Sequence, residues 1–333
     1  MSWSYLKLSQ LEELKNLILL REHCCLKFSA IFMEKYFNIL KNNFVNYENN
    51  AETGIVNKTC LNDLQSDLQN ALQNSSNSKD SVKAHDIIVH NSWPNNALDF
   101  SIMLSENGQL LPVCRKNITI KIIDFNKGLE IFGSTLSKVN TIMGDKKSVN
   151  NILKTCFSRK VVSEGINSFD YYTMTLDENS FIPCTLYPRE INIRLAAQGD
   201  IENLMPLQRN YEIEEVLPNP KMFNEAATKK HLAMILKNQI TAVAEKSGKI
   251  IAKANTNEKG FSYHQIGGVY TLPEYRNMGI STALVSYLIE NIFSKGMKAS
   301  LFVKKNNPAA IKVYIKLGFS KIEDFQITYF LYQ

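Results

Sequence analysis

The order of the elements predicted from residue 191 to the C-terminus constrains the fold most. Apolar residues alternate with polar ones in some segments of this region, as in strands, and recur every three or four residues in others, as in helices. The predicted strands cover residues 191–196, 240–245, 249–255, 261–271, 299–303 and 325–332, and the predicted helices cover 200–211, 223–238, 279–293 and 308–317. This β-α-α-β-β-β-α-β-α-β order predicts an α/β domain at 190–333, with a mixed sheet of the α+β kind.

The first 189 residues follow a different pattern and are predicted to form an accessory region. Residues 1–78 are predicted to be helical, with a capping box at Ser9-Gln10-Leu11-Glu12 and helices at 26–40 and 59–73. Residues 79–189 are predicted to be mixed α/β, with strands at 86–90, 97–104, 118–125 and 171–176, a hairpin turn at 106–109, and helices at 136–143 and 148–156. The clearest linker is the polar segment 74–80, and two prolines mark a break before residue 190.

Composition and charge limit the class of protein. Of the 333 residues, 44% are hydrophobic and 21% are charged, which is typical of a globular protein with a sizeable core. Lys and Arg number 38 against 32 Asp and Glu, and a net charge of +6 is too small to indicate a nucleic-acid partner. The sequence has no run of about 20 apolar residues and no secretory signal at its start, so we expect a cytoplasmic protein that binds no membrane. Its six cysteines lack framework spacing and fit reduced thiols.

A candidate anion site lies between the predicted strand 261–271 and the helix that follows it. The strand ends at Thr271, and a tight loop leads into the helix at about Gly279. Helix N-termini present unpaired N–H groups and a partial positive charge, so they bind phosphate readily. Gly279 lets the backbone approach a ligand closely, Arg276 adds a cation, and Ser281 and Thr282 add hydroxyl groups. The segment therefore predicts a cradle for a pyrophosphate.

Two motifs in this region resemble those of the GNAT superfamily of N-acetyltransferases. The segment Arg276-Asn-Met-Gly-Ile-Ser281 resembles the family's Arg/Gln-x-x-Gly-x-Gly/Ala signature, with Ser in the last position. The segment Asn307–Phe319 resembles the family's Asn-x2-Ala-x3-Tyr-x3-Gly-Phe element, and it follows the expected helix and strand. The order of elements agrees with the same fold. The resemblance covers residue 191 to the C-terminus, roughly two fifths of the chain.

The resemblance implies acetyl-CoA as co-substrate and assigns residues to it. The family's pantetheine arm enters where two neighbouring parallel strands separate, and Gly267-Gly268 fits a β-bulge there. By the resemblance, the pantetheine arm and thioester carbonyl contact Val269, Tyr270 and Thr271. The pyrophosphate contacts Arg276, Asn277, Met278, Gly279, Ile280, Ser281 and Thr282, and Asn307 lies near the acyl-CoA.

The resemblance also implies a direct attack of an amine on the thioester. Such an attack needs a neutral amine, a polarised carbonyl and a protonated leaving thiolate. Tyr314 corresponds to the general acid that protonates the departing thiolate. For the base, the long strand offers His264 and Gln265, of which only the histidine can accept a proton. Because adjacent strand residues face opposite sides, the choice between them stays open.

Three further groups of polar residues are candidates for binding the acceptor, a phosphate or a metal ion. An acidic cluster formed by Glu212, Glu214 and Glu215 follows the first helix of the C-terminal region, where the family shapes its acceptor site, so it could attract a cationic amine. Lys304 and Lys305 could meet the adenosine 3′-phosphate. The third cluster, His23-Cys24-Cys25, is not predicted to bind metal, because adjacent helical residues diverge and the sequence shows no partner pair.

We therefore expect an acetyl-CoA-dependent N-acetyltransferase that acts on a primary amine of a small molecule or peptide. Two alternatives stay open: a catalytically silent CoA-binding regulatory protein, and a transferase that uses a longer acyl-CoA. Residues 1–189 are expected to serve acceptor binding or assembly, and a homodimer is compatible with this organisation. They form either a degenerate GNAT-like copy, of which Gly133–Gly144 would be a remnant, or an unrelated cap.

Overall fold

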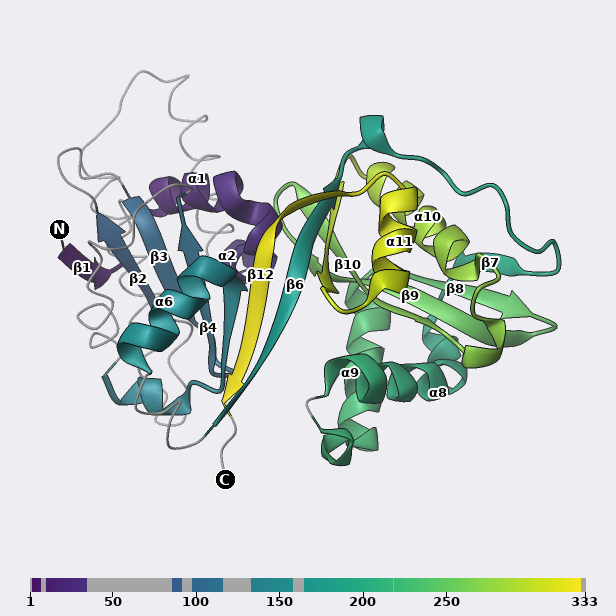
Figure 1. Ribbon diagram of the computed structural model, residues 1–333, viewed down its shortest axis with the longest axis horizontal. Helices are drawn as coiled ribbons and strands as arrows, with labels where there is room; N and C mark the ends of the chain where they lie inside the picture. The colour runs from purple at the N-terminus through teal and green to yellow at the C-terminus, as the bar shows by residue number, and fades with distance from the viewer. Residues whose placement is uncertain are drawn as a thin grey trace, which may run out of the picture. The chain divides into compact units, whose positions relative to one another are not determined.

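The computed structural model describes residues 2–6, 10–34, 86–91, 98–115, 133–157, 165–217 and 219–330. The predicted helix 59–73, linker 74–80 and strand 118–125 lie outside these residues. The chain divides into two compact units (Figure 1). The first comprises 1–21, 27–166 and 327–333, and the second comprises 22–26 and 167–326. The predicted domain boundary between residues 189 and 190 stays a prediction.

The second unit is built on a mixed sheet. Its strands are β6 (Ile166–Leu176), β7 (Asn192–Leu195), β8 (Thr241–Lys246), β9 (Lys249–Lys259), β10 (Tyr263–Thr271), β11 (Lys298–Lys304) and β12 (Ser320–Phe330). They are ordered β12-β6-β11-β10-β9-β8-β7. The β10–β11 pair is parallel, whereas β7–β8, β8–β9, β9–β10 and β6–β11 are antiparallel. The α/β class with a mixed sheet is therefore confirmed.

Four α-helices cover this sheet: α8 (Ile201–Tyr211), α9 (Glu225–Asn238), α10 (Ile280–Phe293) and α11 (Pro308–Lys316). Figure 1 shows α8 and α9 on one side of β8–β10, and α10 and α11 on the other. Alanines at 242, 244, 252 and 254 on β8 and β9 are fully buried, as are Leu284, Leu288 and Ile292 of α10. Small strand residues let helices approach the sheet closely, so both faces of its centre are buried. The element order predicted for 190–333 is confirmed.

Short helical turns connect these elements. They are the 3-10 helices η6 (Glu178–Ser180), η7 (Gln198–Asp200), η9 (Pro220–Met222) and η10 (Pro273–Tyr275), and the π-helix η8 (Glu212–Val216). A further 3-10 helix, η2 (Glu22–Cys24), lies between α1 and α2. Side chains cap two of the α-helices: Asn224 Oδ1 accepts from Ala227 N at 2.9 Å, and Asn307 Oδ1 accepts from Ala310 N at 3.0 Å. Such caps satisfy amides that have no partner within the helix. Asn307 is therefore held in place at the start of α11.

The first unit has its own set of strands and its own core. Its strands are β1 (Ser2–Tyr5), β2 (Asp86–Asn91), β3 (Leu98–Leu104), β4 (Gln109–Cys114) and β5 (Thr141–Asp145), in the order β1-β2-β3-β4-β5, followed by the end of β12. Its α-helices are α1 (Leu11–Arg21), α2 (Leu26–Phe32) and α6 (Lys146–Cys156), with the 3-10 helix η5 at Gly133–Lys138. The predicted hairpin turn at 106–109 is confirmed: Gly108 has φ 75°, and Ser105 N donates to Gln109 O.

One predicted helix, 136–143, is wrong. A 3-10 turn ends at Lys138, and residues 141–145 form β5, which pairs in parallel with β4. Val139 and Ile142 are fully buried in the first core. A β-branched pair, Thr141-Ile142, suits a strand that has a partner. Asp145 then caps α6 by accepting from Ser148 N at 2.9 Å, so the predicted helix at 148–156 is confirmed.

The two units share an order of described elements. The first runs β1-α1-α2-β2-β3-β4, then β5-α6, and β6 of the second unit follows it in the chain. The second continues as β7-α8-α9-β8-β9-β10-α10-β11-α11-β12. In each, the fourth and fifth strands are parallel. This repetition fits the hypothesis of a degenerate first copy, which stays a hypothesis. Among the described helices, none is both long and apolar enough to cross a membrane.

Candidate active site

The parallel strands β10 and β11 separate midway along their length. Their pairing runs from Tyr263 opposite Lys298 to Ile266 opposite Leu301. Beyond that point β10 continues to Thr271, while β11 continues to Lys304 and pairs with β6. The structure thus contains the separated pair of parallel strands that the family resemblance implies.

A β-bulge lies on the other side of β10, where it pairs with β9. The register shifts between Gly267 and Tyr270, which confirms the predicted bulge at Gly267-Gly268. Gly268 has φ 58°, and a Cβ there would lie 2.0 Å from Asn255 Oδ1. Only glycine fits this conformation and this close contact. The bulge therefore turns the backbone of β10 at the point where β10 leaves β11.

The loop after β10 delivers its backbone to the start of α10. Asn277 and Gly279 both have positive φ, at 64° and 78°, and Gly279 is the N-cap residue of α10. Because glycine has no side chain to cap the helix, the amides of the first turn depend on water or a ligand. Thr271 Oγ1 lies 3.0 Å from Ser281 Oγ, which ties the end of the strand to this first turn. Met278 is exposed, whereas Ile280 and Thr282 are buried.

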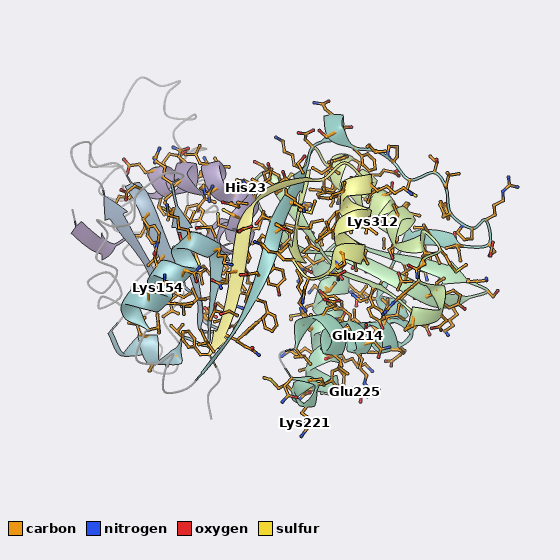
Figure 2. The ribbon with its side chains drawn as sticks, in the orientation of Figure 1. His23, Lys154, Glu214, Lys221, Glu225 and Lys312 are labelled. Carbon is orange, nitrogen blue, oxygen red and sulfur yellow. The ribbon has the colours of Figure 1, made fainter. Side chains whose placement is uncertain are left out.

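Arg276 is held by a carboxylate. Its Nε donates to Thr271 O at 3.0 Å, and its Nη2 donates to Glu214 Oε2 at 3.0 Å. The other oxygen of Glu214 accepts from the Tyr270 hydroxyl at 2.6 Å, and the guanidinium lies 5.3 Å from the Tyr270 ring centroid. Burial and the Glu214 carboxylate together raise the pKa of Tyr270. Figure 2 labels Glu214 on the side of the sheet where α8 and α9 lie. One carboxylate therefore binds two of the predicted cofactor residues.

A second carboxylate, Glu215, contacts the other half of the predicted site. Asn307 Nδ2 donates to Glu215 Oε1 at 3.4 Å, and Lys304 Nζ lies 3.3 Å from Glu215 Oε2. Lys305 is placed elsewhere, 2.7 Å from Asp324 Oδ1. Tyr314 is buried on α11, and its ring packs edge-on against Phe319. Burial, with smaller effects from Tyr211 and Glu215, raises the pKa of Tyr314 well above its usual value. Its hydroxyl therefore stays protonated at neutral pH.

Of the three predicted acidic residues, Glu212 has a different set of partners. Its carboxylate accepts from Gln208 Nε2 at 2.8 Å and from Thr228 Oγ1 at 2.5 Å. It therefore ties η8 to α8 and α9. Because η8 is a single π-helical turn, it directs Glu214 and Glu215 toward residues predicted to bind the cofactor. Their role in acceptor binding stays a prediction.

His264 lies in a different environment from the residues that contact Glu214 and Glu215. Burial, with Lys259 and Lys295 nearby, lowers the pKa of His264 to about 4. Lys295 follows α10, and the buried His264 Nδ1 has no hydrogen-bond partner among the described residues. Gln265 is also buried and faces the opposite side of β10. In the structure, Arg276 and Tyr270 therefore share the partner Glu214, and Lys304 and Asn307 share the partner Glu215. His264 lies apart from them, near Lys259 and Lys295.

Sequence reasoning missed Lys253, a buried lysine beside the bulge. Only 1% of this residue is exposed. Its Nζ donates to Gly268 O at 2.8 Å and to Asn255 Oδ1 at 3.1 Å, and lies 4.9 Å from the Tyr211 ring centroid. Burial lowers the pKa of Lys253 to about 7, against an opposite effect of Glu212. The available signal was a single lysine within the apolar part of a predicted strand.

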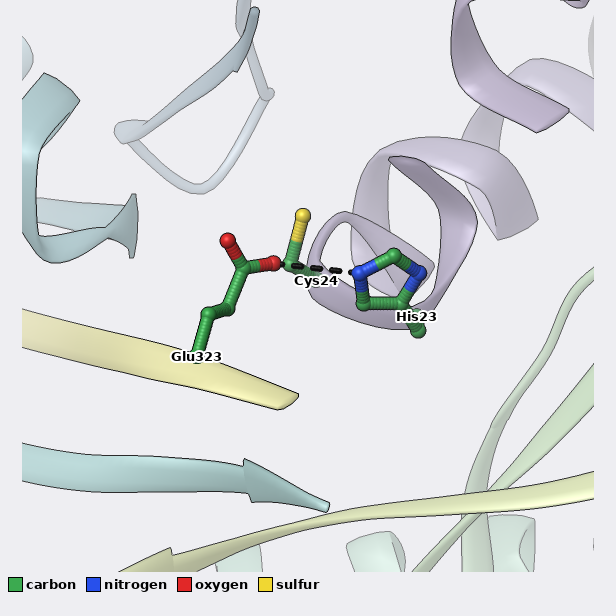
Figure 3. A group of neighbouring side chains, drawn as sticks. All are labelled: His23, Cys24 and Glu323. Atoms are coloured by element: carbon green, nitrogen blue, oxygen red, sulfur yellow. Dashed lines mark ion pairs between the residues drawn. The ribbon is translucent and has the colours of Figure 1, made fainter. Parts of the chain in front are cut away.

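A separate cluster gathers three potential metal ligands, shown in Figure 3. His23, Cys24 and Glu323 bring one donor atom each within 4.8 Å of one another. The sequence showed no partner for His23 and Cys24 because Glu323 comes from β12. An ion pair of 3.2 Å joins His23 Nε2 and Glu323 Oε1. The segment is held in place by the Glu22 carboxylate, which accepts from the amides of Phe261 and Ser262. The expectation that no metal binds here stays a prediction.

Comparison with known proteins places this site within a family. The model of the acetyltransferase (GNAT) family matches residues 207–319. An acetyltransferase of Pectobacterium atrosepticum is 28% identical over 137 residues, which are 40% of this chain and 90% of that protein. An acetyltransferase of Yersinia pestis is 28% identical over 133 residues, which are 39% of this chain and 87% of that protein. Both matches cover nearly the whole relative and only part of this chain.

Solved structures show the same fold over longer stretches. A Drosophila protein superposes with a TM-score of 0.57 over 98% of both chains, at 13% identity. A GCN5-related N-acetyltransferase from Sphaerobacter thermophilus superposes with a TM-score of 0.51 over 77% of this chain and 84% of that one, also at 13% identity. At such identities the likeness shows the fold alone. Together with the family match, the curated relatives identify residues 207–319 as an acetyltransferase domain of the GNAT family.

Proposed function

We propose that this protein is an N-acetyltransferase that transfers the acetyl group of acetyl-CoA to a primary amine of a small molecule or peptide. One observation carries the proposal: β10 leaves β11 after Ile266, at a glycine bulge, directly before the loop that ends at the N-terminus of α10. This arrangement offers unpaired strand backbone for an extended arm and helix amides for its phosphates. Both lie within the residues that match the family.

The cofactor would occupy these two features in order. The pantetheine arm and thioester carbonyl would meet the backbone of residues 269–271, and the pyrophosphate would meet residues 276–282. Arg276 is close enough to contribute once it releases Glu214, its partner at 3.0 Å. Both lysines are ion-paired, Lys304 with Glu215 and Lys305 with Asp324. Lys304 is the better placed for a further phosphate, because it shares Glu215 with Asn307 of the predicted site.

Tyr314 would complete the reaction as general acid. The amine nitrogen bonds to the acyl carbon, the carbon–sulfur bond breaks, and the departing thiolate takes the Tyr314 proton. A phenol with a raised pKa is protonated at neutral pH and can make this donation. The proton lost by the amine passes to a base. Gln265 cannot accept it, and His264, with its pKa lowered to about 4, lies near Lys259 and Lys295.

The test is a calorimetric titration of acetyl-CoA into the full-length protein, followed by a thiol-release assay with a panel of amines. We expect micromolar binding at about one site per chain, and amine-dependent release of CoA. Absence of binding would overturn the proposal. Binding without release for any amine would favour the silent CoA-binding protein, and preference for longer acyl chains in competition would favour the alternative donor.

A further inference from the structure

The ammonium group of Lys253 binds the carbonyl of one peptide unit in the bulge, that of Gly268. We propose that Lys253 is a positioning residue for acyl transfer: by holding the Gly268 carbonyl, it directs the Val269 N–H into the gap between β10 and β11. The inference rests on the proposed function, because the ligand of that N–H would be the thioester carbonyl of acetyl-CoA. Nothing in the family match or in the sequence motifs assigns a role to this lysine.

The geometry follows from the planarity of the peptide bond. In a trans peptide, the C=O of one residue and the N–H of the next point in opposite directions. Lys253 lies on β9, and its Nζ binds Gly268 O at 2.8 Å. The N–H of Val269 belongs to the same peptide unit, so it points away from the Lys253 ammonium group. β10 lies between β9 and β11, and its pairing with β11 ends at Leu301, so beyond Ile266 the backbone of β10 is not paired with β11.

The charge on Lys253 would make this N–H a stronger donor. A hydrogen bond from a charged donor polarises the carbonyl that accepts it, and hydrogen bonds in a chain strengthen one another at low dielectric. The thioester oxygen gains negative charge as the amine attacks. A fixed N–H aimed at that oxygen stabilises the transition state more than the ground state. Lys253 would therefore act on the reaction through the Gly268–Val269 peptide.

The surroundings of Lys253 fit a bound ammonium group. Three acceptors surround Nζ: Gly268 O, Asn255 Oδ1 and the face of the Tyr211 ring. The Asn255 amide donates to Thr256 O and to Asn257 Oδ1, each at 3.0 Å, which fixes its oxygen toward the lysine. Burying a charge is costly, even when it is well paired. A hydrophobic side chain would cost less, so the position favours a role for the charge.

Four titratable groups surround this lysine. Tyr211 ends α8, and Glu212 begins η8 and favours the charged form. Tyr270 lies opposite Lys253 on β10, with its hydroxyl bound to Glu214. The pKa of Lys253, about 7, places its loss of charge within an accessible pH range. Raising the pH therefore removes the charge that polarises the Gly268–Val269 peptide, without a mutation.

The first test compares the wild type with Lys253→Met, which keeps the length of the side chain and removes its charge and donors. We expect acetyl-CoA affinity within about threefold of wild type and a fall in kcat of about ten- to a hundredfold. This is less than the roughly hundred- to thousandfold loss on removal of an oxyanion donor itself, because the Val269 N–H remains. Lys249→Met, at an exposed position on the same strand, is the matched control and should leave both values unchanged. An unchanged kcat in Lys253→Met would overturn the inference.

The second test reads the thioester carbonyl directly. Infrared difference spectra of acetyl-CoA labelled with 13C at the carbonyl should show a lower stretching frequency on the wild type than in water. We expect this shift to shrink between pH 6 and pH 9 in the wild type, and to be small and independent of pH in Lys253→Met. A role limited to folding would not produce this pH dependence. If Lys253→Met fails to fold, the wild-type series still decides: a shift that does not change with pH refutes the role of the charge.

The two proposals fail differently. If the wild type neither binds acetyl-CoA nor releases thiol with any amine, the proposed function is wrong. If the wild type is active and Lys253→Met keeps both its turnover and its carbonyl shift, the proposed function stands and the role of Lys253 is wrong.

Discussion

Because Lys253 is buried, the free energy of unfolding is expected to rise with pH in the alkaline range. The pKa of this lysine is about 7 in the folded chain and 10.5 in the unfolded chain. Between these values the unfolded state binds a proton that the folded state lacks. The free energy of unfolding therefore rises with pH across this range. Below pH 7 both states are protonated, and the full cost of the buried charge is present.

The magnitude follows from these two pKa values. Each pH unit inside the range contributes at most about 1.4 kcal/mol per proton. From pH 7.5 to pH 9.5, Lys253 should add about 2 to 3 kcal/mol to the free energy of unfolding. Lys253→Met has no such proton, so it should lack this increment. The comparison of the two proteins at two pH values cancels every other group that titrates equally in both.

Urea unfolding measured by far-ultraviolet circular dichroism, under reducing conditions, provides the assay. Tryptophan fluorescence is less suitable because both tryptophans, Trp3 and Trp93, precede the acetyltransferase domain. The wild type and Lys253→Met are each unfolded at pH 7.5 and pH 9.5, with Lys249→Met as the control that should follow the wild type. Equal pH dependence in the wild type and Lys253→Met would refute the argument that Lys253 is buried with a lowered pKa.

Four further substitutions test the site. Arg276→Ala should weaken acetyl-CoA binding by about tenfold, because it removes a charge-assisted contact with phosphate, as titration calorimetry would show. Glu214→Gln should strengthen that binding severalfold, since a neutral amide competes less with the pyrophosphate for Arg276; weaker binding would contradict this. Tyr314→Phe should lower kcat with little change in acetyl-CoA affinity, and equal turnover would remove Tyr314 from the mechanism. Gly268→Ala should lower both stability and turnover, because a Cβ there meets Asn255 and its φ is positive; thermal unfolding and kcat measure the two effects.

The sequence predicted those parts of the fold that depend on local pattern. The glycine pair at 267–268 predicted a bulge because glycine tolerates the required backbone, and the structure contains one. The order of elements from residue 190 was predicted because apolar periodicity is strong there. The segment 136–143 was predicted as helix because its apolar spacing fits either structure. Its pairing with β4 decides in favour of a strand, and that pairing is not written in the segment itself.

The contacts that organise the candidate site join residues distant in sequence, and sequence reasoning missed them for that reason. Glu214 and Arg276 lie 62 positions apart, and Glu215 and Asn307 lie 92 positions apart. Each residue was singled out separately, but only the fold brings an acidic segment to residues that had been assigned to the cofactor. Lys253 is a similar case: its burial depends on β8 and β10 on either side of β9 and on α8 above it.

Through these contacts, the positive charges of the candidate site are offset by the carboxylates of η8. Arg276 and Lys304 are each paired with an acid from the single turn η8, and Lys253 is bound by neutral acceptors with Glu212 near it. A pyrophosphate that binds Arg276 must compete with Glu214, so part of its binding energy is used to break that ion pair. On the proposed function, this competition would free the Glu214 carboxylate beside Tyr270, where the attacking amine would arrive as a cation. The acidic turn would therefore oppose cofactor binding and favour the acceptor, and both effects would follow from the position of η8 directly after α8.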